Sequence, residues 1–454
     1  MRCVAVNGQV VGGGGQDPTG ATQEENARSL TLRLDYRDFS LWIAGDLTGG
    51  GNGTPDIESA AALSCGDVDV YKVNHHGSNT STNNNLVTRL QPELALVSAG
   101  VGNPFGHPTT GTTNRLAQGA ALRTMLSTTR GSTNLVGFAA VGNLRIDTDG
   151  RRYRATAQNG DFLDFYVDEV PMAPLAGGDV KITEIQRNPA AVSDFNGEYV
   201  EIQAVGSRPI GLMGMQISDN GSTVTLSSNL MLIPGRPLLL QRDGNTNRNG
   251  GQPLGVPLPF SSLVLADTND TVNVARSGIT LDQVSYTSGF PGGSGVAAER
   301  RDLYGASSAA NFGPAPQTYG AGDRGSPGVT NALDSSAHPV LIDVEVTPEE
   351  LILRATALSH AGKVSAMGVA YGTSPGTPMF GAVLPLNFDS LLQLFLRVPG
   401  MLSQMPAGGY RSLHIPLPPS NPLQGVQVFA AHAILDDQLF VVPGVSPPLA
   451  FTFP

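Results

Sequence analysis

The hydrophobic pattern of the chain changes at the Pro- and Gly-rich segment VPMAPLAGGD, residues 170–179. Before this segment, strand-like runs alternate with helical runs, and after it short alternating strand-like runs follow one another between turn residues. The first pattern is typical of an α/β layered domain, and the second of β-sandwiches. We therefore predict a multi-domain protein with a partial α/β domain first and β-rich domains after it.

The predicted domains follow from length and from the Pro, Gly and Ser content of two segments. With 454 residues, of which 40% are hydrophobic, the chain is long enough for several cores. We expect an α/β domain over 1–169, a linker over 170–179, a second domain over 180–332, a linker over 333–338 and a β-rich domain over 339–454.

Within the first domain, the periodicity predicts alternating strands and helices. We expect strands over 29–36, 38–46, 68–74, 93–100, 122–128 and 143–150, and helices over 56–65, 84–92 and 112–120. The Gly-rich segment over 49–56 is predicted to be a flexible loop.

Charge limits the partners of the chain. The net charge is −11, and only Lys72, Lys181 and Lys363 are lysines, so no basic run could hold a phosphate backbone by charge alone. Any nucleic-acid contact must be local or metal-assisted. No segment reaches the roughly 18 apolar residues of a membrane span. The N-terminus lacks a secretory signal, and we expect the chain to start inside a domain.

Polar residues follow three of the predicted strands. Asp46 comes directly after one strand, His75 and His76 end another, and His107 lies in the motif NPFGHP. Carboxylates and imidazoles are suitable ligands for Zn²⁺ or Mn²⁺. Taken singly, each has a plainer interpretation: Asp46 would lie in a turn, the histidine pair in an exposed loop, and His107 would be a structural histidine. Their order at successive strand ends favours a metal site.

These residues lie in a segment that resembles a known family. The Gly-Asp, the run KVNHHGSNTS, the strand ending in Ser-Ala-Gly and the motif NPFGHP, within residues 24–150, are similar to the C-terminal half of the metallo-β-lactamase-fold domain of ComEC-type competence proteins and related secreted hydrolases. The resemblance implies one half of an αββα sandwich. It also implies that Asp46 bridges two metal ions and that one of His75 and His76, with His76 favoured, is a further ligand.

The resemblance further implies that Asp46 and His76 are catalytic. The residues implied to line a substrate pocket are Ser78, Asn103 and His107. The principal metal motif of the fold, His-x-His-x-Asp-His, does not occur in the chain, and Asn26 and Ser29 stand where many relatives place another histidine. A catalytic metal site needs about three protein ligands, so we expect an incomplete dinuclear Zn²⁺ (or Mn²⁺) site and a sheet face left uncovered.

Residues 180–331 resemble a lamin-tail domain through the Ile-Thr-Glu-Ile start, the Glu-Tyr-Val-Glu-Ile strand and the closing Gly-Ser-Pro-Gly. This resemblance implies an immunoglobulin-like β-sandwich that binds rather than catalyses. Glu184, Glu198 and Glu201 are interpreted as strand residues that face solvent or pair locally. The segment over 243–251 resembles a calcium loop, but Arg248 replaces the required Gly, and we predict a polar hairpin loop.

Two functions fit these expectations. One is an exported metal-dependent hydrolase, phosphodiesterase- or nuclease-like, with a lamin-tail targeting module. We expect this chain to be inactive, because half of the metal motif is absent from it. We favour a truncated gene model as the reason. The alternative is a non-catalytic extracellular binding or structural protein with a degenerate hydrolase remnant. We expect nucleic acid or another phosphodiester as substrate and a cell-surface or extracellular ligand for the lamin-tail domain. The combination of these domains implies an extracellular or cell-surface location.

Overall fold

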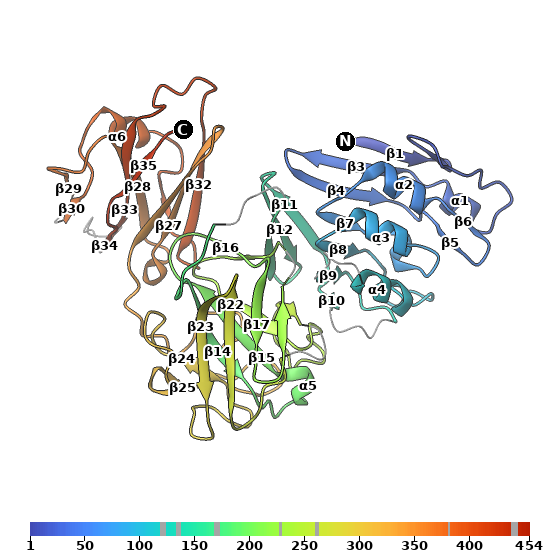
Figure 1. The fold of residues 1–454 in the computed structure, drawn as a ribbon, viewed down its shortest axis with the longest axis horizontal. Helices are drawn as coiled ribbons and strands as arrows, with labels where there is room; N and C mark the ends of the chain where they lie inside the picture. The colour runs from blue at the N-terminus through green and yellow to red at the C-terminus, as the bar shows by residue number, and fades with distance from the viewer. Residues whose placement is uncertain are drawn as a thin grey trace.

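The computed structural model describes residues 1–118, 124–132, 138–167, 173–226, 229–258, 263–379, 382–436 and 444–454. These residues form several separate sheets with few helices (Figure 1), which confirms the expectation of a β-rich protein of several parts. The exact domain boundaries and the lamin-tail topology stay predictions.

The first part is built on one mixed sheet with the strand order β10-β9-β8-β7-β4-β3-β1-β2. Its strands are β1 (Arg2–Val6), β2 (Gln9–Val10), β3 (Thr31–Tyr36), β4 (Phe39–Ala44), β7 (Val70–Lys72), β8 (Leu94–Val97), β9 (Thr124–Ser127) and β10 (Phe138–Ala140). The strands from β4 to β10 in this order pair in parallel, so their C-terminal ends meet at one edge of the sheet. Parallel strands need crossover connections, which here contain the helices.

Helices cover one face of this sheet (Figure 1). They are α2 (Glu58–Cys65), α3 (Asn84–Leu90) and α4 (Thr110–Ala117), with the short α1 (Glu24–Ala27) nearby. Trp42 and Tyr71 point into the core beneath the helices, whereas Phe39 and Val70 on the same two strands point to the opposite face. This alternation is the period-two pattern of a strand buried on both sides.

A three-stranded antiparallel sheet covers the opposite face, and its strands are β11 (Leu144–Thr148), β12 (Arg152–Ala157) and β13 (Phe162–Tyr166). The Tyr153 ring lies 5.3 Å from the Phe39 ring and 4.7 Å from the Phe165 ring, measured between centroids. The expectation of an uncovered sheet face is therefore wrong. The alternating apolar residues of β12 and β13 supply the cover, and our sequence analysis did not predict these two strands.

The second part consists of two larger sheets with a shared apolar core. The strands are β14 (Val180–Gln186), β15 (Tyr199–Ala204), β16 (Ile210–Gly211), β17 (Met215–Ser218), β18 (Thr223–Thr225), β19 (Met231–Leu232), β20 (Leu238–Gln241), β21 (Val256–Pro257), β22 (Asp270–Arg276), β23 (Ile279–Tyr286), β24 (Ala298–Arg300) and β25 (Phe312–Pro314), with the short helix α5 (Asp194–Gly197). Ile182 and Ile202 of one sheet and Val272 and Val284 of the other belong to the same buried cluster as Phe165. The core of the second part is thus continuous with the covered face of the first sheet.

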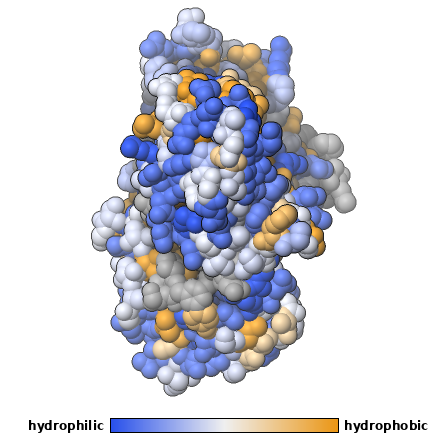
Figure 2. All heavy atoms as spheres, turned by 90° about the vertical axis from the view of Figure 1, so that its right-hand side faces the viewer, coloured by the Kyte–Doolittle hydropathy of each residue, from blue (hydrophilic) through white to orange (hydrophobic). Residues whose placement is uncertain are grey.

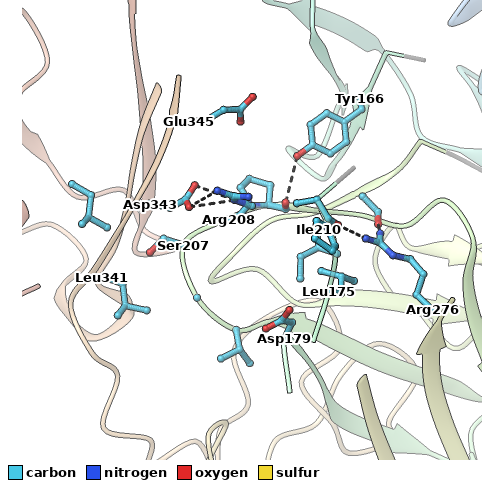
Figure 3. Close-up of a pocket in the computed structure, with 17 residues that line it drawn as sticks. Tyr166, Leu175, Asp179, Ser207, Arg208, Ile210, Arg276, Leu341, Asp343 and Glu345 are labelled. Atoms are coloured by element: carbon cyan, nitrogen blue, oxygen red, sulfur yellow. Dashed lines mark hydrogen bonds and ion pairs between the residues drawn. The ribbon is translucent and has the colours of Figure 1, made fainter. Parts of the chain in front are cut away.

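The third part has its own core beneath two sheets. Its elements are β26 (Leu341–Val346), β27 (Glu350–Thr356), β28 (Val364–Ala370), β29 (Thr377–Met379), β30 (Ala382–Leu384), α6 (Ser390–Phe395), β31 (Leu402–Gln404), β32 (Tyr410–Pro416), β33 (Gln427–Leu435), β34 (Gly444–Val445) and β35 (Leu449–Thr452). A cavity of about 600 Å³ lies between this part and the second (Figure 3). Beside it the Arg208 guanidinium and the Asp343 carboxylate form an ion pair at 2.9 Å.

Two loop predictions need correction. The Gly-rich segment over 49–56 forms a hairpin of β5 (Gly49–Gly51) and β6 (Thr54–Asp56). The linker over 333–338 stays a prediction, and its first residue, Leu333, donates its N–H to the Glu299 carboxylate at 3.0 Å. The calcium-like segment over 243–251 is a loop but not a hairpin, because β20 before it and β21 after it pair in parallel. Within this loop the buried Asp243 pairs with Arg248 at 2.9 Å.

Of the two interpretations given for the glutamates of the second part, exposure to solvent is wrong, whereas local pairing is seen, for example between Glu184 and the Tyr199 hydroxyl at 2.6 Å. Glu184 and Glu201 are 0% exposed, and Glu198 is buried in an ion pair with Arg242 at 2.7 Å. Glu184 and Glu201 accept from the Ser326 and Gly328 N–H groups of the turn after β25, which covers them. Their environment is a buried hydrogen-bond network.

Figure 2 shows the face of the molecule at the right of Figure 1, where hydrophilic side chains predominate and hydrophobic ones gather in small separate groups. Among the described residues, no helix is both long enough and apolar enough to cross a membrane.

Candidate functional site

The candidate site lies where β4 and β7 end, at the edge that the parallel strands share. Asp46 follows β4 by two residues, and the loop after β7 carries His75 and His76. The His76 Nε2 atom lies 3.6 Å from the Asp46 carboxylate, and the His75 Nε2 atom lies 3.9 Å from it. The structure thus brings together the three residues predicted as metal ligands, and their roles stay predictions.

The two histidines owe their orientation to an unusual backbone. His75, His76 and Gly77 all have positive φ values, 48°, 54° and 82°. Such left-handed residues in succession turn the chain sharply after the strand. At Gly77, a Cβ atom would lie 2.6 Å from the Cβ of Pro108, so both conformation and space require glycine there. The sharp turn places the two rings side by side, 6.4 Å apart between centroids.

His76 is the more accessible of the pair and is held in one tautomer. Its Nδ1 lies 2.6 Å from the Ser98 carbonyl oxygen, which can only accept a hydrogen bond. Nδ1 must therefore carry a proton, and in the neutral ring Nε2 has its lone pair on the side of Asp46. The side chains of His76 and Asp46 are 50% and 33% exposed. A neutral imidazole oriented in this way can bind a cation or accept a proton.

His75 lies deeper, with 13% of its side chain exposed. Burial lowers the pKa of His75; the Asp46 carboxylate opposes this shift, and His76 and Lys72 add to it. Among the described atoms, its Nδ1 has no hydrogen-bond partner. The edge of the His107 ring meets it, with 5.6 Å between centroids, and burial is also the main cause of a lowered His107 pKa.

The residues predicted to line the substrate pocket are arranged differently. His107 lies at the site, with one face of its ring stacked on the exposed Phe105. Asn103 uses its side chain inside its own loop, where it accepts from the His107 N–H at 2.8 Å and donates to two carbonyls. Ser78 is buried, and its hydroxyl is bonded to that of Thr80 at 3.1 Å. In this conformation the Ser78 hydroxyl is not presented to a substrate.

The donor atoms present fit a metal ion only in part. A carboxylate and a tautomer-fixed imidazole are suitable zinc ligands, and two ligands of a tetrahedral ion lie roughly 3.4 Å apart, close to the Asp46–His76 separation. However, in the described parts of the chain no group of three or more His, Cys, Asp or Glu side chains is placed to hold a metal ion. These residues alone therefore do not make a complete metal centre.

Sequence reasoning missed the residues that support the site. The Ser29 hydroxyl accepts from the Asp46 N–H at 2.9 Å, whereas the sequence analysis noted Ser29 only as the place of an absent histidine. The Lys72 ammonium donates to the Ala44 carbonyl at 3.0 Å, next to the same turn. The Ser98 contact is made by a backbone carbonyl, for which no residue type gives a signal.

No family model matches the chain. Parts of it are similar to curated proteins of a single kind, whose names refer to competence or recombination. It is 32% identical over 87 residues to "Recombination protein 2" of Haemophilus influenzae (19% of this chain, 10% of that protein). It is 35% identical over 108 residues to "Competence protein ComA" of Neisseria gonorrhoeae (23% and 15%), and 36% identical over 89 residues to "ComE operon protein 3" of Bacillus subtilis (18% and 10%).

These matches support a partial relationship to ComEC-type competence proteins, and the chain spans only about a tenth to a seventh of the length of these relatives. Among solved structures, the chicken interferon gamma receptor alpha chain (8% identity, 60% of this chain and 98% of that chain) has a TM-score of 0.15. A family 2 glycosyl hydrolase of Bacteroides cellulosilyticus (6% identity, 61% and 29%) has a TM-score of 0.16. Likenesses this weak carry no argument about fold.

Proposed function

We propose that the first part of the chain belongs to a metal-dependent hydrolase of the ComEC type that acts on the phosphodiester bonds of nucleic acid. The observation that carries this proposal is the convergence of Asp46, His75 and His76 at the C-terminal edge of parallel strands. The names of the three relatives, which refer to competence and recombination, support nucleic acid as the substrate class.

In this proposal Asp46 and His76 contribute two ligands of an incomplete Zn²⁺ or Mn²⁺ site, and further donors complete it. When bound, such an ion activates a water molecule for hydrolysis. What this chain supplies is a carboxylate beside an imidazole whose Nε2 is free to accept. The β-rich second and third parts would then act outside the cell as targeting modules for a cell-surface or extracellular ligand.

One observation favours a second candidate, a non-catalytic extracellular binding or structural protein with a hydrolase remnant. It is the absence, within the described residues, of a cluster of three or more metal-ligating side chains. The net charge of −11 also gives no general affinity for a nucleic-acid backbone.

Metal uptake and DNA cleavage by the full chain distinguish the two candidates. Zn²⁺ and Mn²⁺ binding is measured by calorimetry, and cleavage with labelled single- and double-stranded DNA, for the wild type, Asp46→Ala, His76→Ala and the control Asp35→Ala. Asp35 is an exposed carboxylate on β3, paired with Arg33. We expect at least tenfold weaker metal binding, with any cleavage lost, in the first two variants only. Metal binding that Asp46→Ala leaves unchanged would contradict the proposal, and a wild type that neither binds nor cleaves would favour the second candidate.

A further inference from the structure

Glu58, the first residue of α2, is a wholly buried carboxylate with an unusual set of partners. Its Oε1 accepts from the Asn74 side-chain amide and from the Thr82 N–H, both at 2.7 Å, and its Oε2 accepts from the Asn83 N–H at 2.8 Å. Asn74 directly precedes the two histidines of the candidate site, and Thr82 and Asn83 end the same loop. One carboxylate therefore holds both ends of the loop that carries the histidines.

The network continues from Asn74 to the strand that ends at the candidate aspartate. The Asn74 side-chain oxygen accepts from the Trp42 indole N–H at 2.9 Å, and Trp42 lies on β4. The Asn74 N–H donates to the Tyr71 hydroxyl at 3.1 Å, and its carbonyl accepts from the Ser81 hydroxyl at 3.0 Å. All the polar groups of Asn74 thus have partners in the interior, which leaves this residue one orientation.

The contacts of Asn74 matter because the residues that follow it in the loop have strained backbone conformations. His75, His76 and Thr82 have φ values of 48°, 54° and 59°, which residues with a Cβ adopt rarely. Such a conformation persists only where surrounding contacts hold it. The three donors at Glu58 are all N–H groups, so this carboxyl group accepts through both of its oxygens.

We propose that Glu58 is a positioning residue that, through Asn74, sets the two imidazoles against Asp46. The inference rests on the proposed function and deepens it, because it gives a supporting role at the same site to Glu58, which is 0% exposed and contacts both ends of the histidine loop. It concerns a loop geometry that exists with or without a bound metal, so it can be tested separately.

A buried carboxylate elsewhere in the same sheet serves as the control for mere stabilisation. Asp69 is 4% exposed and accepts from the Ser40 N–H at 2.7 Å and from the Ser40 hydroxyl at 3.1 Å. It also joins the region of β4 to β7, but at the opposite ends of these strands from the histidines. Asp69→Asn and Glu58→Gln each replace a buried carboxylate by the corresponding amide. Only Glu58 contacts the loop that carries the histidines.

The experiment uses the full chain with ¹⁵N-labelled histidine and reads the ring-nitrogen shifts of His75 and His76 by NMR. In the wild type we expect the Nδ1-protonated tautomer of His76 that its bond to Ser98 requires. Both variants should lower the melting temperature, but only Glu58→Gln should displace the two histidine signals. Unchanged histidine signals in Glu58→Gln would overturn the proposal and make Glu58 a stabilising residue only.

Two further variants keep the test sharp. In Glu58→Gln/Asn74→Asp the amide and the carboxylate exchange places, so the contact between these two side chains is restored while the Thr82 N–H loses its acceptor. We expect the histidine signals to return part of the way toward those of the wild type. If Glu58→Gln does not fold, Trp42→Phe removes the indole donor to Asn74, together with part of a buried ring, and should shift the same signals by a smaller amount. No shift in Trp42→Phe would then contradict the proposal.

Zinc titration of the same samples separates the two proposals. Loss of an outer support of a metal ligand typically weakens binding by about 10–100-fold, and we expect this for Glu58→Gln but not for Asp69→Asn. A wild type that binds no zinc would count against the proposed function, while the histidine signals would still decide the role of Glu58.

Discussion

Three glutamates of the second part, Glu184, Glu201 and Glu299, are buried side by side with 0% exposure each. Their partners are hydroxyls and backbone N–H groups. The Ser326 N–H donates to Glu184 at 3.0 Å and the Gly328 N–H donates to Glu201 at 2.8 Å. These carboxylates fasten the Gly-Ser-Pro-Gly turn onto the sheet. Burial without a paired cation disfavours the ionised form of such groups.

The stability of the second part should therefore fall as the pH rises. Burial raises the pKa of Glu184 to about 7, and that of Glu201 well above its ordinary value. Because the folded state then holds protons that the unfolded state has released above about pH 4.5, the free energy of unfolding decreases from there through about pH 7. Urea unfolding across this range should show the decrease, and Glu201→Gln should flatten it. The exposed control Glu349→Gln should not change the slope, and an unchanged slope in Glu201→Gln would contradict the assignment.

At the scale of elements, the sheet of β11, β12 and β13 links two cores. Tyr153 packs on Phe39 of the first sheet, and Phe165 stacks on Tyr153 with an angle of 2° between the rings. Phe165 also pairs with Leu230 of the second part through an isolated β-bridge. Since all four residues belong to one buried cluster, the first sheet and the second part share their stability.

Phe165→Ala should destabilise both parts together. Removing a wholly buried Phe side chain typically lowers the free energy of unfolding by about 3–5 kcal/mol. We expect hydrogen exchange to accelerate in the strands of the first sheet and in those of the second part. The control Phe105→Ala removes a ring that is 76% exposed and should change stability by no more than about 0.5 kcal/mol. Faster exchange in only one of the two parts would show that their cores are independent.

At the scale of the whole molecule, charged groups join the third part to the rest. The His414 Nδ1 lies 3.1 Å from the Glu350 carboxylate, and its Nε2 accepts from the Arg152 guanidinium. Arg151 pairs with Glu350 from the same side at 3.4 Å. His414 accepts at Nε2 and donates at Nδ1, so this contact requires the neutral imidazole.

Acidification should loosen this contact. Burial, then the Arg152 charge, lowers the pKa of His414, while Glu350 opposes the shift. A base with a lowered pKa binds fewer protons in the closed state, so the contact is retained at neutral pH and lost as the pH falls below about 6.5. Small-angle scattering should give a larger radius of gyration at about pH 5.5 than at about pH 7.5. His414→Gln stays neutral and should remove this difference, and a pH-dependent radius in that variant would point to another group.

Local pattern was enough to predict many elements of the first part. The strands that became β3, β4, β7 and β8 were predicted from strand-like runs, and the helix predicted over 84–92 became α3, which ends at Leu90 before Pro92. The hairpin of β5 and β6 was missed because glycine-rich segments have no side-chain pattern. The strands β12 and β13 were missed although the sequence contains their alternating apolar residues, among them Tyr153 and Phe165.

The sequence by itself determined which chemistry the chain can offer, namely an aspartate and two histidines directly after strands. Only the tertiary structure decided that β4 and β7 are parallel neighbours, that Asp46 and His76 therefore face each other, and that Glu58 reaches Asn74. The physical reason is that periodicity records which face of an element is buried, whereas the partner of a buried polar group is set by packing between elements that are distant along the chain.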